Sequence, residues 1–389
     1  MLFCFRTTGL IIMFKKIAKI LTTPRISYQP LVEVRIYKDS ILHNLRQYQK
    51  RYPKLAVAPV LKSNAYGHGL IQIAKILGQE SLPFFVVDSF YEALTLRQER
   101  VKNKILILGF TSLDQVNKGL ENCSFGITSL ENLKIISKNL KSKRAFHLKI
   151  DTGMHRLGIL TSEIQDALRL IKKNKNIILE GLCTHLADSE NENVDFTNQQ
   201  MTEWNKSVKI FRENFSAIKY FHVANTAGTR IEGIDANVAR VGIGLYGIDT
   251  APKARLDLKP ALEMVCVIAS IKNINPKDKI GYSLTYEATR PMRIAIAPVG
   301  YYEGVDRRLS NKGSFIVGNK PCKIVGRVSM NMTAIDISMV PGVKLGESVL
   351  VISRNLRDKN SVENIAKICN SLEREILVHI PASLRRVVI

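Results

Sequence analysis

The feature that most constrains the fold is an alternation of short apolar runs with helix-like segments between residues 31 and 259. In the helix-like segments apolar residues recur three or four positions apart, as in Leu130, Leu133, Ile136 and Leu140. Eight β-strands alternating with helices predict a (β/α)8 barrel, although periodicity alone leaves an open doubly wound sheet as the alternative. The apolar runs are Leu55–Leu61, Phe84–Val87, Lys104–Leu108, Phe125–Thr128, Ala145–Ile150, Leu179–Thr184, Tyr220–Ala224 and Asn237–Val241.

The pattern changes after residue 259, where strand-like runs are divided by turn signals such as Asn275-Pro276 and Pro341-Gly342. We therefore expect an α/β chain with a barrel over residues 30–259, a mostly β domain over 260–389 and a peripheral extension over 1–29. One helix is expected, over Val362–Leu372. The strand-like runs are Leu262–Ile271, Arg293–Pro298, Gly313–Val317, Lys323–Ile324, Ala334–Ile337 and Glu347–Ile352.

Charge is the unusual part of the composition. The formal net charge of the 389 residues is +23, which raises the question of nucleic-acid binding. The basic residues are scattered, and no dense basic block or nucleic-acid-binding motif is present, so a lysine-rich solvated surface is the better interpretation. A positive field would also favour an anionic substrate and a phosphorylated cofactor.

The cysteines and the N-terminal segment bear on the compartment. The six cysteines form no C-x-x-C pair, which is typical of a reduced cytoplasmic protein without a zinc site or a disulfide framework. The apolar run from Leu10 to Phe14 is too short to span a bilayer, and we expect no membrane association. Met13 is an alternative start to Met1.

Polar residues at the ends of the predicted barrel strands are the candidates for chemistry, because barrel enzymes place their sites there. Each has an ordinary explanation when taken alone: a surface lysine, a structural histidine, an ion-paired arginine. Several polar ends in one barrel are harder to explain in that way. A lysine at the mouth of a buried strand is also suited to Schiff-base chemistry. These ends are Lys62, Lys149 to Asp151, Thr184-His185, Asn225-Thr226 and Arg240.

The segment Gly242-Ile243-Gly244-Leu245-Tyr246-Gly247 matches the G-x-G-x-x-G pattern of dinucleotide-binding proteins. That interpretation requires a helix to open at the glycines, but Pro252 follows soon after and the chain then enters the β-rich region. A glycine-rich loop after the last strand of a barrel is instead a common phosphate site, because its backbone N–H groups can surround the anion.

From about Leu31 to its C-terminus the chain resembles the alanine racemases, a two-domain family with a pyridoxal phosphate-binding barrel. The resemblance depends on several motifs that occur in the family's order. They are the segment Ala58 to Gly69 around Lys62, Asp151 to Gly158, Thr184-His185, His222 to Asn225, Arg240 to Gly247, Gly281-Tyr282, Gly300-Tyr301 and Gly326 to Met330.

The resemblance implies interconversion of L- and D-alanine on a pyridoxal 5'-phosphate aldimine, supplying D-alanine for peptidoglycan. Lys62 would carry the cofactor and serve as one of two acid–base groups. Tyr282, from the partner subunit of a homodimer, would be the other, on the opposite face of the substrate. Arg240 would face the pyridine nitrogen, where a permanent positive charge disfavours protonation. His185 would lie between Arg240 and Tyr282.

Further roles follow from the same resemblance. Tyr66, Thr226, Gly242 and Ile243 match the phosphate-binding set. Arg156 matches a residue that meets the substrate carboxylate, and Met330 matches a contact from the partner chain. Lys149 matches a lysine that is carbamylated in some relatives.

The chain departs from the family at positions that bear on the choice of substrate. Thr226 replaces a frequent serine, Asn331 replaces an aspartate, and Arg374 stands where a tyrosine usually narrows the substrate entry. A racemase for larger or basic amino acids is therefore one alternative. A non-catalytic pyridoxal phosphate-binding protein is another, although the β-rich domain and Tyr282 argue against it. A barrel-type decarboxylase is a weaker alternative, because its glycine-rich loop and catalytic cysteine are not found.

Overall fold

The computed structural model describes residues 28–251 and 256–389. The chain divides into two compact units, Met1–Leu31 and Val32–Ile389, and the description below concerns the second unit. The predicted extension over residues 1–29 and the alternative start at Met13 therefore lie almost wholly outside the described residues. The expected domain boundary at residue 259 stays a prediction.

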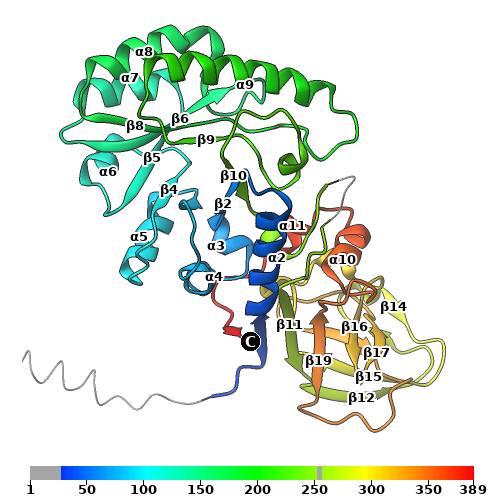
Figure 1. Cartoon of the computed structure of the whole chain (residues 1–389). Coiled ribbons are helices and arrows are strands. Elements are labelled where there is room, and N and C mark those ends of the chain that lie inside the picture. The colour runs from blue at the N-terminus through cyan, green and yellow to red at the C-terminus, as the bar shows by residue number, and fades with distance from the viewer. Residues whose placement is uncertain (1–27, 252–255) are drawn as a thin grey trace, which may run out of the picture. The chain divides into compact units, whose positions relative to one another are not determined.

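The predicted N-terminal barrel is confirmed. Parallel pairing runs without interruption from β3 through β4, β5, β6 and β8 to β9, and β10 pairs in parallel with β2. The backbone N–H of Leu61 donates to Val86 O (2.8 Å) and so connects β2 with β3. Figure 1 shows these strands curled beneath the helices α7, α8 and α9. The strands are β2 (Ala56–Pro59), β3 (Phe85–Val87), β4 (Ile105–Ile107), β5 (Cys123–Ile127), β6 (Arg144–Asp151), β8 (Ile177–Cys183), β9 (Tyr220–His222) and β10 (Val238–Val241).

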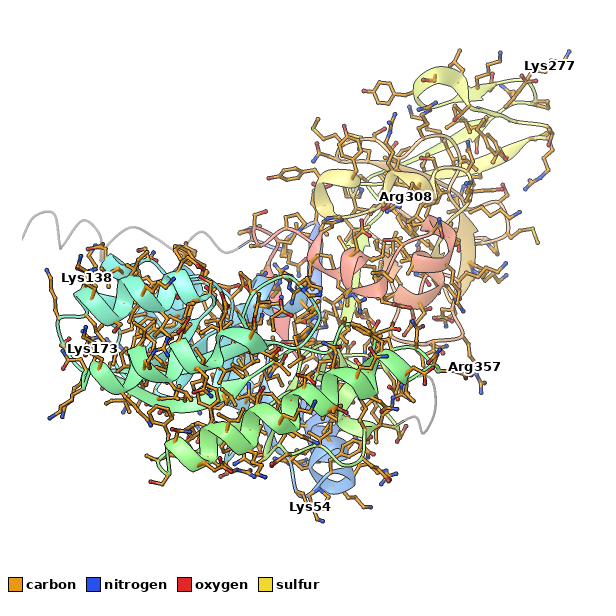
Figure 2. The ribbon with its side chains drawn as sticks, turned by 90° about the horizontal axis from the view of Figure 1, so that it is seen from above. Lys54, Lys138, Lys173, Lys277, Arg308 and Arg357 are labelled. Atoms are coloured by element: carbon orange, nitrogen blue, oxygen red, sulfur yellow. The ribbon has the colours of Figure 1, made fainter. Side chains whose placement is uncertain are left out.

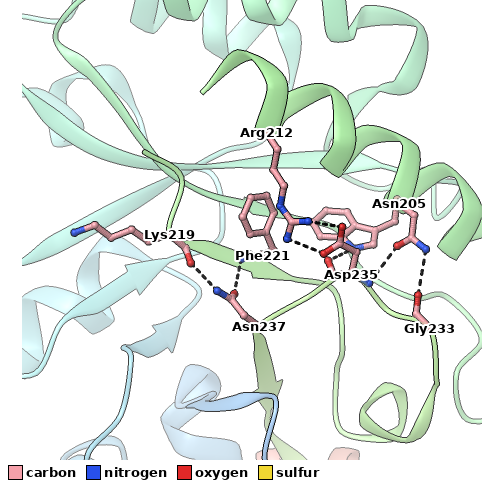
Figure 3. Close-up of polar contacts among 8 residues, drawn as sticks. Asn205, Arg212, Lys219, Phe221, Gly233, Asp235 and Asn237 are labelled. Atoms are coloured by element: carbon pink, nitrogen blue, oxygen red, sulfur yellow. Dashed lines mark hydrogen bonds and ion pairs between the residues drawn. The ribbon is translucent and has the colours of Figure 1, made fainter. Parts of the chain in front are cut away.

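Asn237 makes the remaining junction of the barrel, between β9 and β10. Its backbone N–H donates to Phe221 O, and its side-chain Oδ1 accepts from Phe221 N (2.8 Å). Figure 3 shows the same amide bonded to the carbonyl of Lys219. Nearby, Asp235 pairs with both Nη atoms of Arg212, at 2.7 Å each. These contacts fix the start of β10 and hence the height of its last residues in the barrel.

The helices follow the predicted periodicity. In α8 the buried residues are Ile164, Ala167, Leu168 and Ile171, which is one face of a helix. Three other barrel helices begin at a serine that caps the first turn, Ser89 before α5, Ser112 before α6 and Ser129 before α7. The helices around the barrel are α2 (Lys38–Arg51), α3 (Lys62–Tyr66), α4 (Leu70–Leu77), α5 (Phe90–Gln98), α6 (Leu113–Lys118), α7 (Leu130–Asn139), α8 (Ile164–Lys173) and α9 (Asp195–Asn214).

The C-terminal region is mostly β, as predicted, and its largest sheet has the order β17-β16-β19-β11-β1-β20. A second sheet has the order β12-β15-β18. The N-terminal strand β1 (Val32–Ile36) pairs with β11, so residues from both ends of the chain complete the sheet. The other strands are β11 (Leu262–Val267), β12 (Ser270–Ile274), β13 (Lys279–Ile280), β14 (Tyr286–Glu287), β15 (Met292–Ala297), β16 (Ser314–Val317), β17 (Lys320–Lys323), β18 (Thr333–Asp336), β19 (Ser348–Ile352) and β20 (Arg386–Val388).

Three predicted elements differ from the structure by more than two residues at one end. The run Leu262–Ile271 is broken into β11 and β12, which belong to different sheets. The strand expected at Lys323–Ile324 begins earlier, at Lys320, because it forms a hairpin with β16. The helix expected over Val362–Leu372 ends at Cys369, where Asn370 adopts φ 47°, and a separate helix α11 (Glu373–Val378) follows α10 (Val362–Cys369).

No helix among the described residues is long and apolar enough to cross a membrane. The positive charge is dispersed, and Figure 2 shows Lys54, Lys138, Lys173 and Lys277 projecting outward from different elements.

Candidate active site

A cavity of about 520 Å³ opens at the carboxyl ends of the barrel strands. It brings together all of the predicted site residues except Tyr282 and Met330. Residues 225 and 226 approach it after β9, and residues 240 to 243 approach it at the end of β10. The predicted residues that line it are Lys62, Tyr66, Lys149, Arg156, His185, Thr226, Arg240, Gly242 and Ile243.

Lys62 stands at the start of a left-handed turn. Ser63, Asn64, Ala65 and Tyr66 all have φ between 52° and 56°, a conformation that costs about 1–2 kcal/mol for each such residue. Contacts from other elements hold the turn: Ser63 N donates to Glu92 Oε1 (2.6 Å), and Asn64 Oδ1 accepts from Leu70 N (2.9 Å). This turn is therefore unfavourable in its own backbone energy, and the contacts from other elements hold it so that Lys62 and Tyr66 lie at the cavity.

Backbone and hydroxyl groups form a cradle at one end of the cavity. Thr226 Oγ1 accepts from the N–H groups of Gly242 (3.3 Å) and Gly244 (3.4 Å). A Cβ atom on Gly242 would lie 2.7 Å from the hydroxyl oxygen of Tyr66, so a larger residue at position 242 would press on that hydroxyl. Converging N–H and O–H donors of this kind bind phosphate groups.

Arg240 is buried and held by carbonyl oxygens and imidazole nitrogens. Its Nη1 donates to His222 Nδ1 (2.8 Å) and to the carbonyl of His222. Its Nη2 donates to Thr184 O (2.6 Å) and contacts His185 Nδ1 (3.2 Å). Among the described residues no acceptor is found for the Nε–H group. A guanidinium held in this way can donate one further hydrogen bond, toward the cavity that Arg240 lines.

The cavity is electropositive. Lys149 is 6 % exposed and forms no ion pair with any described residue, and burial and the charge of Arg240 lower the pKa of its amine. Burial, Arg240 and Arg156 hold the pKa of His185 well below its usual range, so the imidazole is neutral at pH 7. A site with Lys62, Lys149, Arg156 and Arg240 around one cavity suits a ligand that carries several negative charges.

Tyr282 and Met330 lie elsewhere on the same chain. Tyr282 begins a short 3-10 turn, η4 (Tyr282–Leu284), and is 71 % exposed. It lines a second, open cavity together with Tyr301, and Met330 is 55 % exposed. Tyr302 N donates to Met330 O, which brings the exposed aromatic and methionine side chains into one patch. Within one chain these residues do not complete the barrel cavity.

Two features of the site were not predicted from the sequence. The first is the bidentate ion pair of Arg374 with Glu190 (2.9 and 3.3 Å), which compensates the charge of Arg374 where this residue lines the cavity, at the substrate entry that the resemblance implied. Beneath the cavity, a hydrogen-bonded chain leads from Arg240 through His222 and His147 to Glu180. In the sequence these four residues are polar positions within predicted strands. The ordinary alternation of inward and outward residues along a strand explains such positions equally well, so the sequence does not identify this hydrogen-bonded chain.

The donors fit pyridoxal phosphate group by group. The cradle matches the phosphate, the Nε–H of Arg240 matches the pyridine nitrogen, and Lys62 supplies the amine that such a cofactor requires. When bound, the cofactor supplies an electron-withdrawing ring that makes the α-hydrogen of an amino acid acidic. The fold and site together define a barrel protein with an electropositive cavity at the carboxyl ends of its strands.

Two family models match nearly the whole of the described chain, those for the N-terminal domain (residues 36–250) and the C-terminal domain (residues 261–388) of alanine racemase. The chain therefore belongs to the alanine racemase family.

Individual relatives agree with this assignment. The alanine racemase of Methylacidiphilum infernorum is 32 % identical over 94 % of this chain and 95 % of its own length. The solved alanine racemase of Clostridium difficile 630 is 28 % identical, with a TM-score of 0.86 over 93 % of this chain and 97 % of that chain. The Bacillus anthracis enzyme, solved with bound L-Ala-P, is 28 % identical, with a TM-score of 0.85 over 93 % of this chain and 96 % of its own.

Proposed function

We propose that this chain interconverts L-alanine and D-alanine with pyridoxal 5'-phosphate. The observation that carries the proposal is the convergence of Lys62, the Gly242 cradle and Arg240 on one cavity. Incubation of the purified protein with L-alanine and the cofactor should yield D-alanine until the two enantiomers are equal. Cofactor-loaded protein that forms no D-alanine would refute the proposal.

Lys62 and Tyr282 act as the two acid–base groups in this proposal. Lys62 binds the cofactor through its amine and exchanges a proton with one face of the substrate Cα. Tyr282 of the partner subunit exchanges a proton with the other face. One base on each face allows inversion without a large movement of the substrate. The exposure of Tyr282 in a single chain supports its use by a second copy.

Arg240 keeps the cofactor's reactivity within limits. Its guanidinium would donate a hydrogen bond to the pyridine nitrogen and would disfavour a proton there, because two positive charges would then be adjacent. With the cofactor bound, Arg240 would make the ring a weaker electron sink, which would favour return of the proton to the α-carbon over transfer of the amino group. Neutral His185 contacts the same guanidinium and can lie between Arg240 and Tyr282 of the partner subunit.

Arg156 binds the substrate carboxylate in this proposal, and Lys149 positions it. A buried amine with a lowered pKa can react with carbon dioxide to give a carbamate. That change replaces a positive charge with a negative one beside Arg156 and Arg240, and so relieves the repulsion among three cations. Mass spectrometry under native conditions would detect the added 44 Da of the carbamate.

The ion pair between Arg374 and Glu190 favours alanine over a basic substrate. Each charge satisfies the other, so neither is free to bind a charged substrate side chain. Asn331 donates to Glu303 Oε1 (2.8 Å), so a carboxylate lies beside the position where the family has aspartate. Rates on alanine, serine, lysine and arginine distinguish an alanine racemase from a racemase for larger or basic amino acids. Faster turnover of lysine than of alanine would favour the second hypothesis.

We also propose a homodimer in which Tyr282 and Met330 complete the partner's cavity. The exposed patch around them supports a second copy as the occupant. From the resemblance we infer that the protein supplies D-alanine for peptidoglycan, and we propose that it does so as a cytoplasmic enzyme.

A further inference from the structure

The polar chain beneath the cavity crosses the barrel interior on neighbouring strands. Arg240 Nη1 bonds His222 Nδ1 (2.8 Å), His222 Nε2 bonds His147 Nδ1 (2.7 Å), and His147 Nε2 bonds Glu180 Oε1 (3.3 Å). Lys104, just before β4, ends the chain with a 2.5 Å contact from its Nζ to Glu180 Oε2. Both imidazoles and the guanidinium are at least nine-tenths buried.

The direction of every hydrogen bond in this series follows from its two end groups, the guanidinium of Arg240 and the carboxylate of Glu180. Arginine only donates, so His222 Nδ1 must accept and His222 must carry its proton on Nε2. That proton is donated to His147 Nδ1, which must also accept, so His147 carries its proton on Nε2. An ionised carboxylate only accepts, and Glu180 therefore receives the last bond. Every donor in the chain points from Arg240 toward Glu180.

The surroundings keep the imidazoles in this arrangement. The ring of Tyr220 stacks on His147 with centroids 5.6 Å apart, and Phe84 meets the same imidazole edge-on at 5.3 Å. Burial lowers the pKa of both histidines, in agreement with neutral rings. Ser124 donates its hydroxyl to Glu180 Oε1, so this carboxylate oxygen is fixed in place from a second side.

We propose that Glu180 is a positioning residue for Arg240: by accepting from His147 it fixes both histidines as the Nε2–H tautomers, which keeps Arg240 bonded through Nη1. Arg240 then presents its remaining donor, Nε–H, to the cavity. The tautomer assignment stands on geometry alone, while its effect on catalysis rests on the proposed function.

Replacement of Glu180 by glutamine gives a specific test. Lys104 only donates, so it requires the glutamine oxygen and turns the amide nitrogen toward His147. His147 must then accept at Nε2 and carry its proton on Nδ1, which forces a proton onto His222 Nδ1, against Arg240. Removing Lys104 as well, in Glu180→Gln/Lys104→Met, frees the glutamine oxygen to face His147 and restores the original direction.

Two-bond ¹H–¹⁵N NMR of histidine-labelled protein without cofactor reads these tautomers directly. The wild type should show His147 and His222 protonated at Nε2, Glu180→Gln should move the His147 proton to Nδ1, and the double variant should return it. Glu99→Gln, in the surface pair of Glu99 with Lys75, is a control that should change neither imidazole. An Nε2–H tautomer that persists in Glu180→Gln, or a double variant without recovery, overturns the proposal.

Steady-state kinetics of the cofactor-loaded variants test the catalytic consequence. Hydrogen-bond partners that orient metal-bound imidazoles affect activity 10–100-fold, and by analogy we expect kcat of Glu180→Gln to fall by about tenfold, with recovery to within about threefold in the double variant. KM for alanine should change little, because neither residue lines the cavity. Loss of kcat without recovery would show that Glu180 supports only the fold. A wild type that forms no D-alanine would refute the proposed function and leave the tautomer result standing.

Discussion

The imidazole of His147 occupies the space that a side chain at position 181 would need. A Cβ atom on Gly181 would lie 2.2 Å from His147 Nδ1, which is the atom bonded to His222. We expect Gly181→Ala to lower the free energy of unfolding by about 2–3 kcal/mol, as overpacking of a buried site does. Urea denaturation measures this change. In a His147→Ala background the same substitution should cost less than about 1 kcal/mol, because the opposing ring is gone.

The cradle around Gly242 should be sensitive to one methyl group. The Cβ of an alanine at position 242 would lie 2.7 Å from the Tyr66 hydroxyl oxygen and would press on it. We expect Gly242→Ala to weaken pyridoxal phosphate binding by about tenfold or more, which corresponds to the loss of about one hydrogen bond to a charged group. Absorbance titration of the apoprotein measures this affinity. Unchanged affinity would place the phosphate elsewhere.

Tyr282→Phe tests the proposed second base. Removing an acid–base group typically costs 10²–10⁴-fold, so we expect kcat to fall by roughly a thousandfold while cofactor binding is retained. Tyr91→Phe is a matched control, because Tyr91 is 75 % exposed on α5 and lies outside both cavities. A rate within twofold of the wild type in Tyr282→Phe would remove Tyr282 from the mechanism.

Mixing two inactive variants tests whether the site is shared. A heterodimer of Lys62→Ala and Tyr282→Phe contains one site with both groups intact. Random reassociation of an equal mixture makes half of the dimers mixed, so about a quarter of the wild-type activity should return. If Tyr282 served its own chain's cavity, the mixture would stay inactive. Size-exclusion chromatography before and after mixing verifies that the chains have exchanged.

The free energy of unfolding should depend on pH partly through the protonation of His68. Burial lowers the pKa of this imidazole to about 4, and its Nε2 has no partner among the described residues. Because the unfolded state binds the proton more tightly, stability is full above about pH 6.5 and falls as the pH drops toward about 4. Replacement by glutamine should reduce the slope of unfolding free energy against pH in this window by at most about 1.4 kcal/mol per unit. An unchanged slope would show that His68 is not the responsible group.

The local sequence determined the elements that depend on nearby residues. Short apolar runs between amphipathic helices predicted the eight barrel strands, because strand and helix periodicities differ and neighbouring strands pair in parallel through a helical crossover. Lys62 and the Gly242 loop could be proposed as site residues for the same reason: they follow strands whose ends meet at one face of a barrel. The family motifs added their chemical roles.

Tertiary structure decided what depends on residues far apart in the chain. Arg374 and Glu190 are separated by 184 positions, and nothing local predicts that they pair. The strand β1 joins the C-terminal sheet because β11 and β20 offer it hydrogen-bonding edges, although it lies more than 200 positions from either strand in the sequence.

The hydrogen-bonded chain of side chains from Arg240 to Glu180 shows most clearly the difference between what the sequence and what the tertiary structure determine. Each member is a polar residue in a strand that also carries apolar residues, and the sequence alone does not distinguish a surface position from an inward one. Closure of the barrel brings the strands together, and an arginine at one end with a carboxylate at the other then leaves a single set of protonation states. The sequence determined which groups are available, and long-range packing determined which way their protons point.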